Sequence, residues 1–404
     1  MKTPWDDRIV IKLSEENEWN VRMPAKKSDQ PVLWLKHQGN RCRMFFEEHG
    51  ILTRSLPTVD ILSTEEDQPL HMKKDLAEHI QKHGIQAVNP NCDGWELSVQ
   101  RNTKKPWRVH VLGLGDVGGT LLTGLRLLAD EAVEEIGIFD LDTNRRRRWA
   151  YELNQIVDPN RHYMAPVIEI EMGRLFDCDM FVFCASKAVP KVGEEGKDVR
   201  MVQYEANAQI IEIYAKMARN ANFKGIFAVV SDPVDQLCKV VWDRSNRDDK
   251  GNWDGTGLLP EQVRGYGLGV MYARAKYFAN ELNVPFHDGR AYGPHGKDLI
   301  VANSIAGYDR QVSESLTEKT VTANLAVREV GYKPYIAPAL SSGAISLLHT
   351  IWGNWHYSAV EMDGAWMGCR NRRTAYGDQV ERMPLPSVLL NNIRQVHDKL
   401  AAHE

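Results

Sequence analysis

Between residues 106 and 265, short apolar runs alternate with stretches of helical periodicity. The runs are apolar on both faces, and they lie at residues 109–112, 136–140, 167–170, 180–184 and 226–230. The helical patterns fall between them at residues 120–130, 144–157 and 204–220. Short strands of this kind, separated by helices, are typical of a parallel sheet that is covered on both sides. We therefore predict a doubly wound α/β domain over residues 106–265.

The first 105 residues have a different pattern. Strand-like runs at residues 8–13, 31–35 and 95–99 and one amphipathic helix at residues 73–83 predict a small α+β domain of unknown role. Residues 100–106 are polar and end in a proline, which indicates a linker. Residues 266–404 form the third predicted domain.

A glycine-rich turn, GLGDVG at residues 113–118, lies between the first predicted strand of the α/β domain and the next helix. In such a turn the first glycine allows the sharp bend, the second lets a diphosphate approach, and the third lets helix and strand pack closely. The helix N-terminus then faces the phosphates. The predicted dinucleotide contacts in the turn are Gly113, Gly115, Asp116, Val117 and Gly118.

The second strand of this domain ends in Asp140, at the distance from the turn where an acid binds the ribose hydroxyls. A carboxylate there repels the extra phosphate of NADP, so Asp140 favours NAD. Arginines occupy residues 145–148, but consecutive helical positions point in different directions, and we interpret them as a solvated helix end. Ala185 and Ser231 follow two other strands at the ligand-binding edge of the sheet, and we predict that they also contact the cofactor.

Composition and charge narrow the function classes. The 404 residues carry a formal net charge of -4, with 43% hydrophobic and 26% charged residues, and no apolar stretch reaches the length of a membrane span. We expect no nucleic-acid or membrane partner and a cytoplasmic location. The six cysteines lie far apart, which favours reduced thiols over a disulfide framework, and no cluster has metal-ligand spacing.

From its motifs the chain resembles the lactate/malate dehydrogenase family over about residues 108–380. The matching segments are the glycine turn, AYELNQ at 150–155, RMVQYEANA at 200–208, SDPVD at 231–235, GPHGK at 293–297 and KPYIAP at 333–338. The resemblance implies a Rossmann-type doubly wound parallel sheet, followed by the family's α+β C-terminal domain and preceded here by the small α+β domain. It further implies an NAD-dependent enzyme that transfers a hydride between nicotinamide and a 2-hydroxy or 2-oxo acid, and a homo-oligomer (dimer or tetramer).

The resemblance also assigns roles to individual residues. His295 would donate the proton to the substrate carbonyl and accept it in the reverse reaction, and Arg200 would polarise that carbonyl. Arg274 would bind the substrate carboxylate, and Asn207 would contact the substrate. Lys191 lies at the position where the family contacts the end of the substrate that is distant from the carboxylate, so it is a candidate partner for a second anionic group.

The chain departs from the family pattern at the histidine's partner. Met271 occupies the position of the family's aspartate, and Asp232 stands where the family has an asparagine. We hypothesise that Asp232 has become the partner of His295; the alternative is that Asp232 only caps the following helix. Pro334 stands where the family has a threonine, which makes the site more apolar and predicts a substrate larger or more unusual than lactate.

The sequence is also compatible with two other functions. The same fold could reduce an imine formed from an amine and a 2-oxo acid, as in opine-type chemistry. Alternatively, the chain could be a catalytically decayed NAD-binding protein whose N-terminal domain serves a partner protein.

Overall fold

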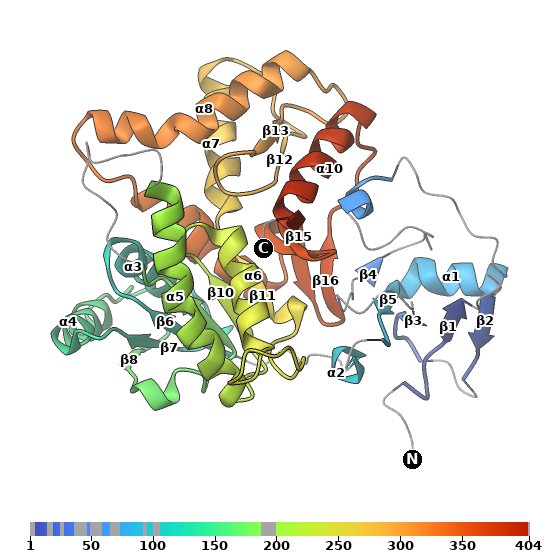
Figure 1. The fold of residues 1–404 in the computed structure, drawn as a ribbon, viewed down its shortest axis with the longest axis horizontal. Helices are drawn as coiled ribbons and strands as arrows, with labels where there is room; N and C mark the ends of the chain where they lie inside the picture. The colour runs from blue at the N-terminus through green and yellow to red at the C-terminus, as the bar shows by residue number, and fades with distance from the viewer. Residues whose placement is uncertain are drawn as a thin grey trace.

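The computed structural model describes residues 5–13, 19–24, 28–35, 47–48, 59–64, 73–91, 95–99, 106–186 and 199–402. In Figure 1 the N-terminal region lies to one side of a larger body, and the C-terminal helix α10 (Ser387–Ala402) lies between them. The predicted linker at residues 100–105 falls outside the described residues. None of the helices that the structure describes is long and apolar enough to cross a membrane.

Six parallel strands form the centre of the larger body. In space they follow the order β8-β7-β6-β9-β10-β11, so that β6, the first in sequence, is next to β9 and the strand order reverses there. This is the order of a Rossmann-type sheet, and it confirms the predicted fold class. The strands are β6 (Trp107–Leu112), β7 (Val133–Phe139), β8 (Val167–Glu169), β9 (Met180–Phe183), β10 (Ile226–Val229) and β11 (Val263–Gly265).

Alternate residues of these strands pack on opposite faces of the sheet. Val109 and Val111 belong to a cluster that includes α3 (Asp116–Leu128), whereas Leu112 belongs to another that includes α5 (Val199–Asn220) and α6 (Val234–Ser245). The helix α4 (Thr143–Asn154) follows β7. Because both faces are covered, the strands read as continuous apolar runs in the sequence.

Three antiparallel strands extend the sheet beyond β11 and were not predicted. Together with the parallel part, β14 (His356–Met362), β15 (Ala365–Thr374) and β16 (Gly377–Val380) form one nine-stranded sheet. The boundary that we predicted at residue 265 is therefore crossed by a continuous sheet. The remaining elements of this region are α7 (Leu268–Glu281), β12 (Arg290–Tyr292), β13 (Ile300–Ala302), α8 (Arg310–Glu329), the π-helical η4 (Pro338–Ile345) and α9 (Ser346–Trp352).

The N-terminal region contains a mixed five-stranded sheet of order β2-β1-β3-β5-β4. Its elements are β1 (Val10–Leu13), β2 (Trp19–Arg22), β3 (Val32–Leu35), β4 (Glu47–Glu48), η1 (Val59–Leu62), α1 (Lys74–His83), β5 (Ile85–Val88) and α2 (Glu96–Val99). The strand predicted at residues 95–99 was wrong, because this segment forms α2. Trp95 and Val99 are four residues apart and pack in the same cluster. Residues with this spacing share one face of a helix and also one face of a strand, so the pattern of so short a segment does not distinguish the two.

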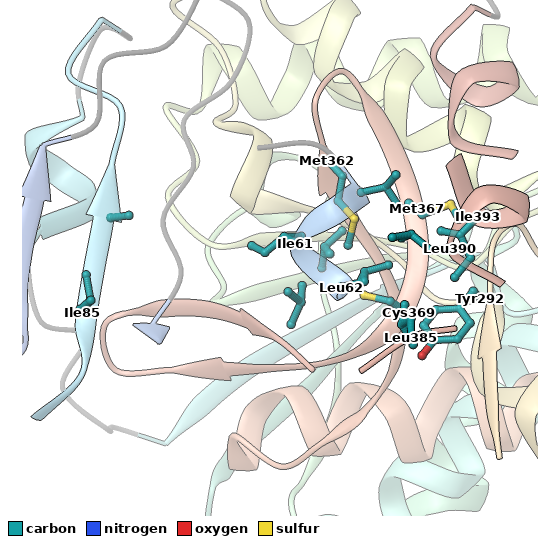
Figure 2. Close-up of a cluster of buried hydrophobic side chains, with 14 of the residues drawn as sticks. Ile61, Leu62, Ile85, Tyr292, Met362, Met367, Cys369, Leu385, Leu390 and Ile393 are labelled. Carbon is teal, nitrogen blue, oxygen red and sulfur yellow. The ribbon is translucent and has the colours of Figure 1, made fainter. Parts of the chain in front are cut away.

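The N-terminal region shares its core with the C-terminal region. Figure 2 shows Ile61 and Leu62 of η1 among Met362, Met367 and Leu390, and all five side chains belong to one buried cluster. Burial of apolar surface of this kind is the main stabilising contribution to the interface. The N-terminal region is therefore an integral part of the folded chain.

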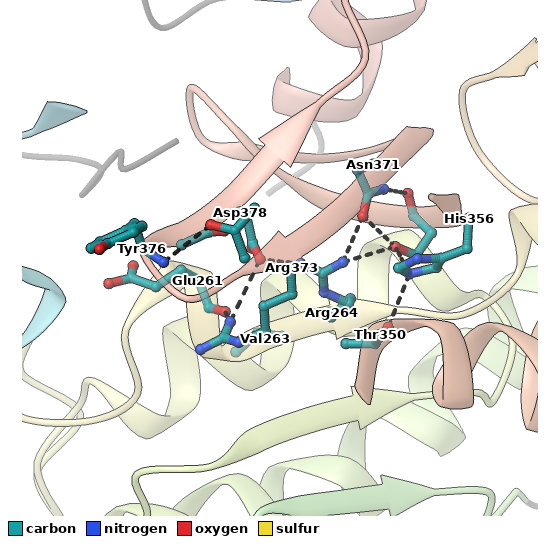
Figure 3. Close-up of polar contacts among 12 residues, drawn as sticks. Glu261, Val263, Arg264, Thr350, His356, Asn371, Arg373, Tyr376 and Asp378 are labelled. Atoms are coloured by element: carbon teal, nitrogen blue, oxygen red, sulfur yellow. Dashed lines mark hydrogen bonds and ion pairs between the residues drawn. The ribbon is translucent and has the colours of Figure 1, made fainter. Parts of the chain in front are cut away.

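A buried polar network ties β11 to the antiparallel extension (Figure 3). Arg264 of β11 is 1% exposed; its Nη1 donates to Oδ1 of Asn371 at 2.6 Å and to the hydroxyl of Ser358 at 3.2 Å, and its Nη2 pairs with Asp378 of β16. Asp378 also lies 3.5 Å from Nη1 of Arg373. The network compensates the cost of burying the guanidinium, which would otherwise be large.

Substituting Asp378 should be strongly destabilising, because Arg264 would be left buried without its carboxylate. We predict that Asp378→Ala lowers the free energy of unfolding by about 3–5 kcal/mol in urea denaturation. The matched control is Glu314→Ala, which breaks the exposed pair of Arg310 and Glu314 and should cost at most about 1 kcal/mol. An equal decrease in the free energy of unfolding in the two variants would show that the buried pair stabilises the fold no more than the exposed pair does.

Candidate active site

The glycine turn joins β6 to α3. Neighbouring backbone packs closely against one side of it, and the other side has free space next to it. Gly113 has a φ of +88°, and a Cβ there would lie 2.7 Å from the backbone nitrogen of Ala185. At Gly118 a Cβ would lie 1.8 Å from the carbonyl oxygen of Gly113, so a side chain is excluded at both positions. At Gly115, the N-cap residue of α3, a Cβ would meet no atom within 4 Å. This open side at a helix N-terminus fits the diphosphate of a dinucleotide.

Asp140 follows β7, and its carboxylate lies against the glycine turn. Its Oδ2 accepts a hydrogen bond from the N–H of Leu114 at 2.8 Å and lies 3.2 Å from Nη1 of Arg145. The neighbouring Arg146 is buried and donates to the carbonyl oxygen of Ile170 instead, so the adjacent arginines point in different directions. An acid at this place fits the ribose hydroxyls of NAD.

A hydrogen bond joins the ends of β9 and β10. The hydroxyl of Ser231 donates to the carbonyl oxygen of Ala185 at 2.8 Å. Ala185 also lies against Gly113, so these predicted cofactor contacts adjoin one another. The ends of β6, β9 and β10 therefore form one site where the strand order reverses.

His295 lies in the loop after β12, close to the start of α7. A Cβ at Gly267 would lie 2.6 Å from the Cβ of His295, so only glycine permits this approach. Nδ1 of His295 is 2.9 Å from Oδ1 of Asp232. The helix α6 takes Pro233 as its N-cap residue, which places Asp232 one residue before the cap. Asp232 was considered either as the partner of His295 or as a helix cap, and in the structure its carboxylate contacts the imidazole.

Opposing effects act on the pKa of His295. Burial lowers it, but the carboxylate of Asp232 raises it by attraction and by hydrogen bonding, and the resulting pKa lies above the ordinary value of 6.5. Because Nδ1 faces Asp232, Nε2 is the ring nitrogen left to exchange a proton with a ligand. The side chain is 16% exposed, so a ligand at the surface can reach it.

Asp235 belongs to the same cluster but was not among the predicted site residues. Its Oδ2 accepts a hydrogen bond from the backbone N–H of His295 at 3.1 Å. Burial raises the pKa of this carboxyl group to about 6. The sequence did contain a signal, because Asp235 ends the SDPVD segment and lies in the first turn of α6, three residues after Asp232.

Arg274 of α7 is half-buried beside the same carboxylate. Burial lowers the pKa of its guanidinium, and the negative charge of Asp232 opposes this effect. Within the described residues its hydrogen-bonding contact is to the sulfur of Met271, at 3.7 Å from Nη1. A thioether is a weak acceptor, so the guanidinium can still bind an anionic ligand strongly.

The remaining predicted residues come from α5 and the loop before it. Asn207 is fully buried, and its Nδ2 donates to the backbone carbonyl oxygen of Asp232 at 2.7 Å, so it holds the segment that carries the acid. Arg200 lies in the first turn of α5. Lys191 falls outside the described residues. Among the residues that the structure describes, no group of three or more His, Cys, Asp or Glu side chains is arranged to hold a metal ion.

Comparison with known proteins agrees with this geometry. Residues 107–253 match the family model described as lactate/malate dehydrogenase, NAD binding domain. L-lactate dehydrogenase 1 of Staphylococcus aureus (strain JH9) is 26% identical over 235 residues, which are 57% of this chain and 67% of that protein. The same figures hold for the enzyme of strain N315.

Solved structures share the fold. A lactate dehydrogenase from a Medee basin deep-sea metagenome library has a TM-score of 0.59 at 19% identity, covering 73% of this chain and 97% of its own. Malate dehydrogenase of Archaeoglobus fulgidus in complex with NADH has a TM-score of 0.58 at 20% identity, covering 72% and 97%. The chain is therefore an NAD-dependent dehydrogenase whose residues 107–253 match the NAD-binding domain of lactate/malate dehydrogenases, and it shares the fold of these enzymes.

Proposed function

We propose that the chain transfers a hydride between nicotinamide and a 2-hydroxy or 2-oxo acid, with His295 as the proton donor and acceptor. The observation that carries this proposal is the 2.9 Å contact between His295 and Asp232, at the same edge of the sheet as the glycine turn. When bound, the nicotinamide supplies or accepts the hydride. The chain supplies the proton, the orientation and the positive charge.

His295 has the arrangement that proton transfer requires. In the direction of reduction, its protonated Nε2 donates to the oxygen of the 2-oxo group as that oxygen gains negative charge. In the direction of oxidation, the neutral Nε2 accepts the hydroxyl proton. In the neutral imidazole the contact with Asp232 keeps the remaining proton on Nδ1, so Nε2 is the acceptor in each cycle.

Arg274 provides the anchor for the substrate carboxylate. A guanidinium can form two parallel hydrogen bonds to a carboxylate, and its position near Asp232 places that anchor beside the proton donor. On the family resemblance, Arg200 polarises the carbonyl, and Lys191 accommodates a second anionic group. We therefore infer a 2-oxo acid substrate and favour acids larger than pyruvate.

The direct test uses the whole chain with NADH and a panel of 2-oxo acids, each with and without amines, and follows the oxidation of NADH. We expect turnover with 2-oxo acids alone. His295→Gln should lower kcat/KM by about 10²–10⁴-fold, the usual contribution of a general acid. The dissociation constant for NADH should stay unchanged, because the substitution lies outside the glycine turn.

Three outcomes would contradict this proposal. Turnover that requires an amine would indicate imine reduction on the same fold. Tight NADH binding with no turnover on any acid would indicate a decayed enzyme. Full activity in His295→Gln would remove the histidine from the reaction.

The pH dependence tests the role of Asp232. Since the carboxylate raises the pKa of His295, Asp232→Asn should lower that pKa. Reduction requires the protonated imidazole, so its rate decreases as the pH is raised through the pKa. In the variant this decrease should occur at a lower pH than in the wild type. Oxidation requires the neutral imidazole, so its rate increases as the pH is raised through the pKa. In the variant this increase should occur at a lower pH than in the wild type. The measurement is kcat/KM against pH in both directions.

The matched control for this test is Asp243→Asn near the other end of α6, where the acid pairs with Arg247. It removes the same negative charge near the opposite end of α6 from His295 and should leave both pH profiles unchanged. A profile that is unchanged in Asp232→Asn, or shifted equally in the control, would rule out the proposed role.

A further inference from the structure

Lys333 lies on the segment that crosses from α8 to η4, at residues 330–337. The segment is fixed at its end, because η4 packs on α3: a Cβ at Gly124 of α3 would lie 2.7 Å from the Cβ of Ala344, and one at Gly343 would lie 2.7 Å from Cδ1 of Leu121. These contacts pack η4, into which the segment leads, against the middle of α3. Lys333 therefore comes from the C-terminal region but lies at the glycine turn.

The ammonium group of Lys333 contacts the glycine turn directly. Its Nζ lies 2.9 Å from Oδ2 of Asp116, the first residue of α3, across 217 positions of sequence. Both side chains are exposed, at 81% for Lys333 and 51% for Asp116. Within the described residues, Asp116 is the hydrogen-bonding partner of Lys333. The contact places an ammonium group on a flexible side chain beside the first residue of α3.

The negative charges of Asp116 and of a bound diphosphate explain why a cation is needed at the N-terminus of α3. A carboxylate in the first turn of a helix is favourable to the helix dipole, but it repels a diphosphate that approaches the same N-terminus. Lys333 neutralises Asp116. An ammonium group has three donors on a flexible stem, so it can bind a phosphate oxygen as well as, or in place of, the carboxylate.

We propose that Lys333 is a ligand of the cofactor diphosphate, held at the glycine turn by Asp116 until the dinucleotide binds. This inference rests on the proposed dehydrogenase function. It adds a cofactor contact from the C-terminal region to those of the parallel sheet.

A double-mutant cycle of Lys333→Ala and Asp116→Asn separates this role from simple neutralisation. Dissociation constants are measured by fluorescence for NADH and by calorimetry for ADP-ribose, which has the diphosphate but no nicotinamide. Lys333→Ala should weaken both ligands about tenfold, the cost of one charge-assisted hydrogen bond at an exposed site. Asp116→Asn should bind both as tightly as the wild type or more tightly, because the repelling charge is gone.

The double variant decides the question. If Lys333 binds the diphosphate, the double variant binds about tenfold more weakly than Asp116→Asn alone. If Lys333 only neutralises Asp116, the double variant matches Asp116→Asn, and the proposal is wrong. The matched control is Lys216→Ala, which breaks the pair between the exposed Lys216 and the half-buried Glu212 (Nζ to Oε1, 2.7 Å) and should change neither affinity.

Two further results are informative. A Lys333→Ala protein with unchanged NADH affinity but a raised KM for the oxo acid would assign Lys333 to the substrate and overturn the proposal. A wild-type chain that binds neither NADH nor ADP-ribose would refute the dehydrogenase function itself. The failure of the inference is thus distinct from the failure of the function on which it rests.

Discussion

The contact between Nδ1 of His295 and Oδ1 of Asp232 connects the parallel sheet to the C-terminal region. Asp232 is placed by the end of β10, and its carbonyl oxygen is held by Asn207 of α5. His295 comes from the loop after β12 and is held by the bond from its backbone to Asp235. Asp232 and Asp235 lie at the start of α6, so this one segment holds both the ring and the backbone of His295 and fixes the orientation of the imidazole. The proposed proton transfer depends on that orientation.

The family pattern places the acid on α7, where this chain has the buried Met271. An acid that orients a histidine needs only to bring one oxygen within hydrogen-bonding distance of one ring nitrogen, and its element of origin is secondary. The turn after β10 satisfies that condition through Asp232. The electrostatic requirement of the reaction can therefore be met although the expected aspartate is absent, and Arg274 is left with a sulfur contact instead of a carboxylate in its own helix.

The sequence was most informative where local chemistry determines structure. The glycine turn, Asp140 and the parallel strands were predictable because each follows from periodicity or from a short motif. The antiparallel strands β14–β16 were missed, since pairing with β11 is a long-range property. The segment at residues 95–99 was misassigned because a five-residue window fits two periodicities. Asp235 was missed because its role depends on a backbone N–H sixty positions away.

The pKa of His295 in the resting protein can be measured without substrate. The ring resonances of His295, followed by NMR as a function of pH, report its pKa directly. Burial alone would place this pKa below 6.5, whereas the neighbouring carboxylate places it above. We expect a pKa above 6.5. A value at or below 6.5 would contradict this expectation, because Asp232 would then not be the electrostatic partner of His295.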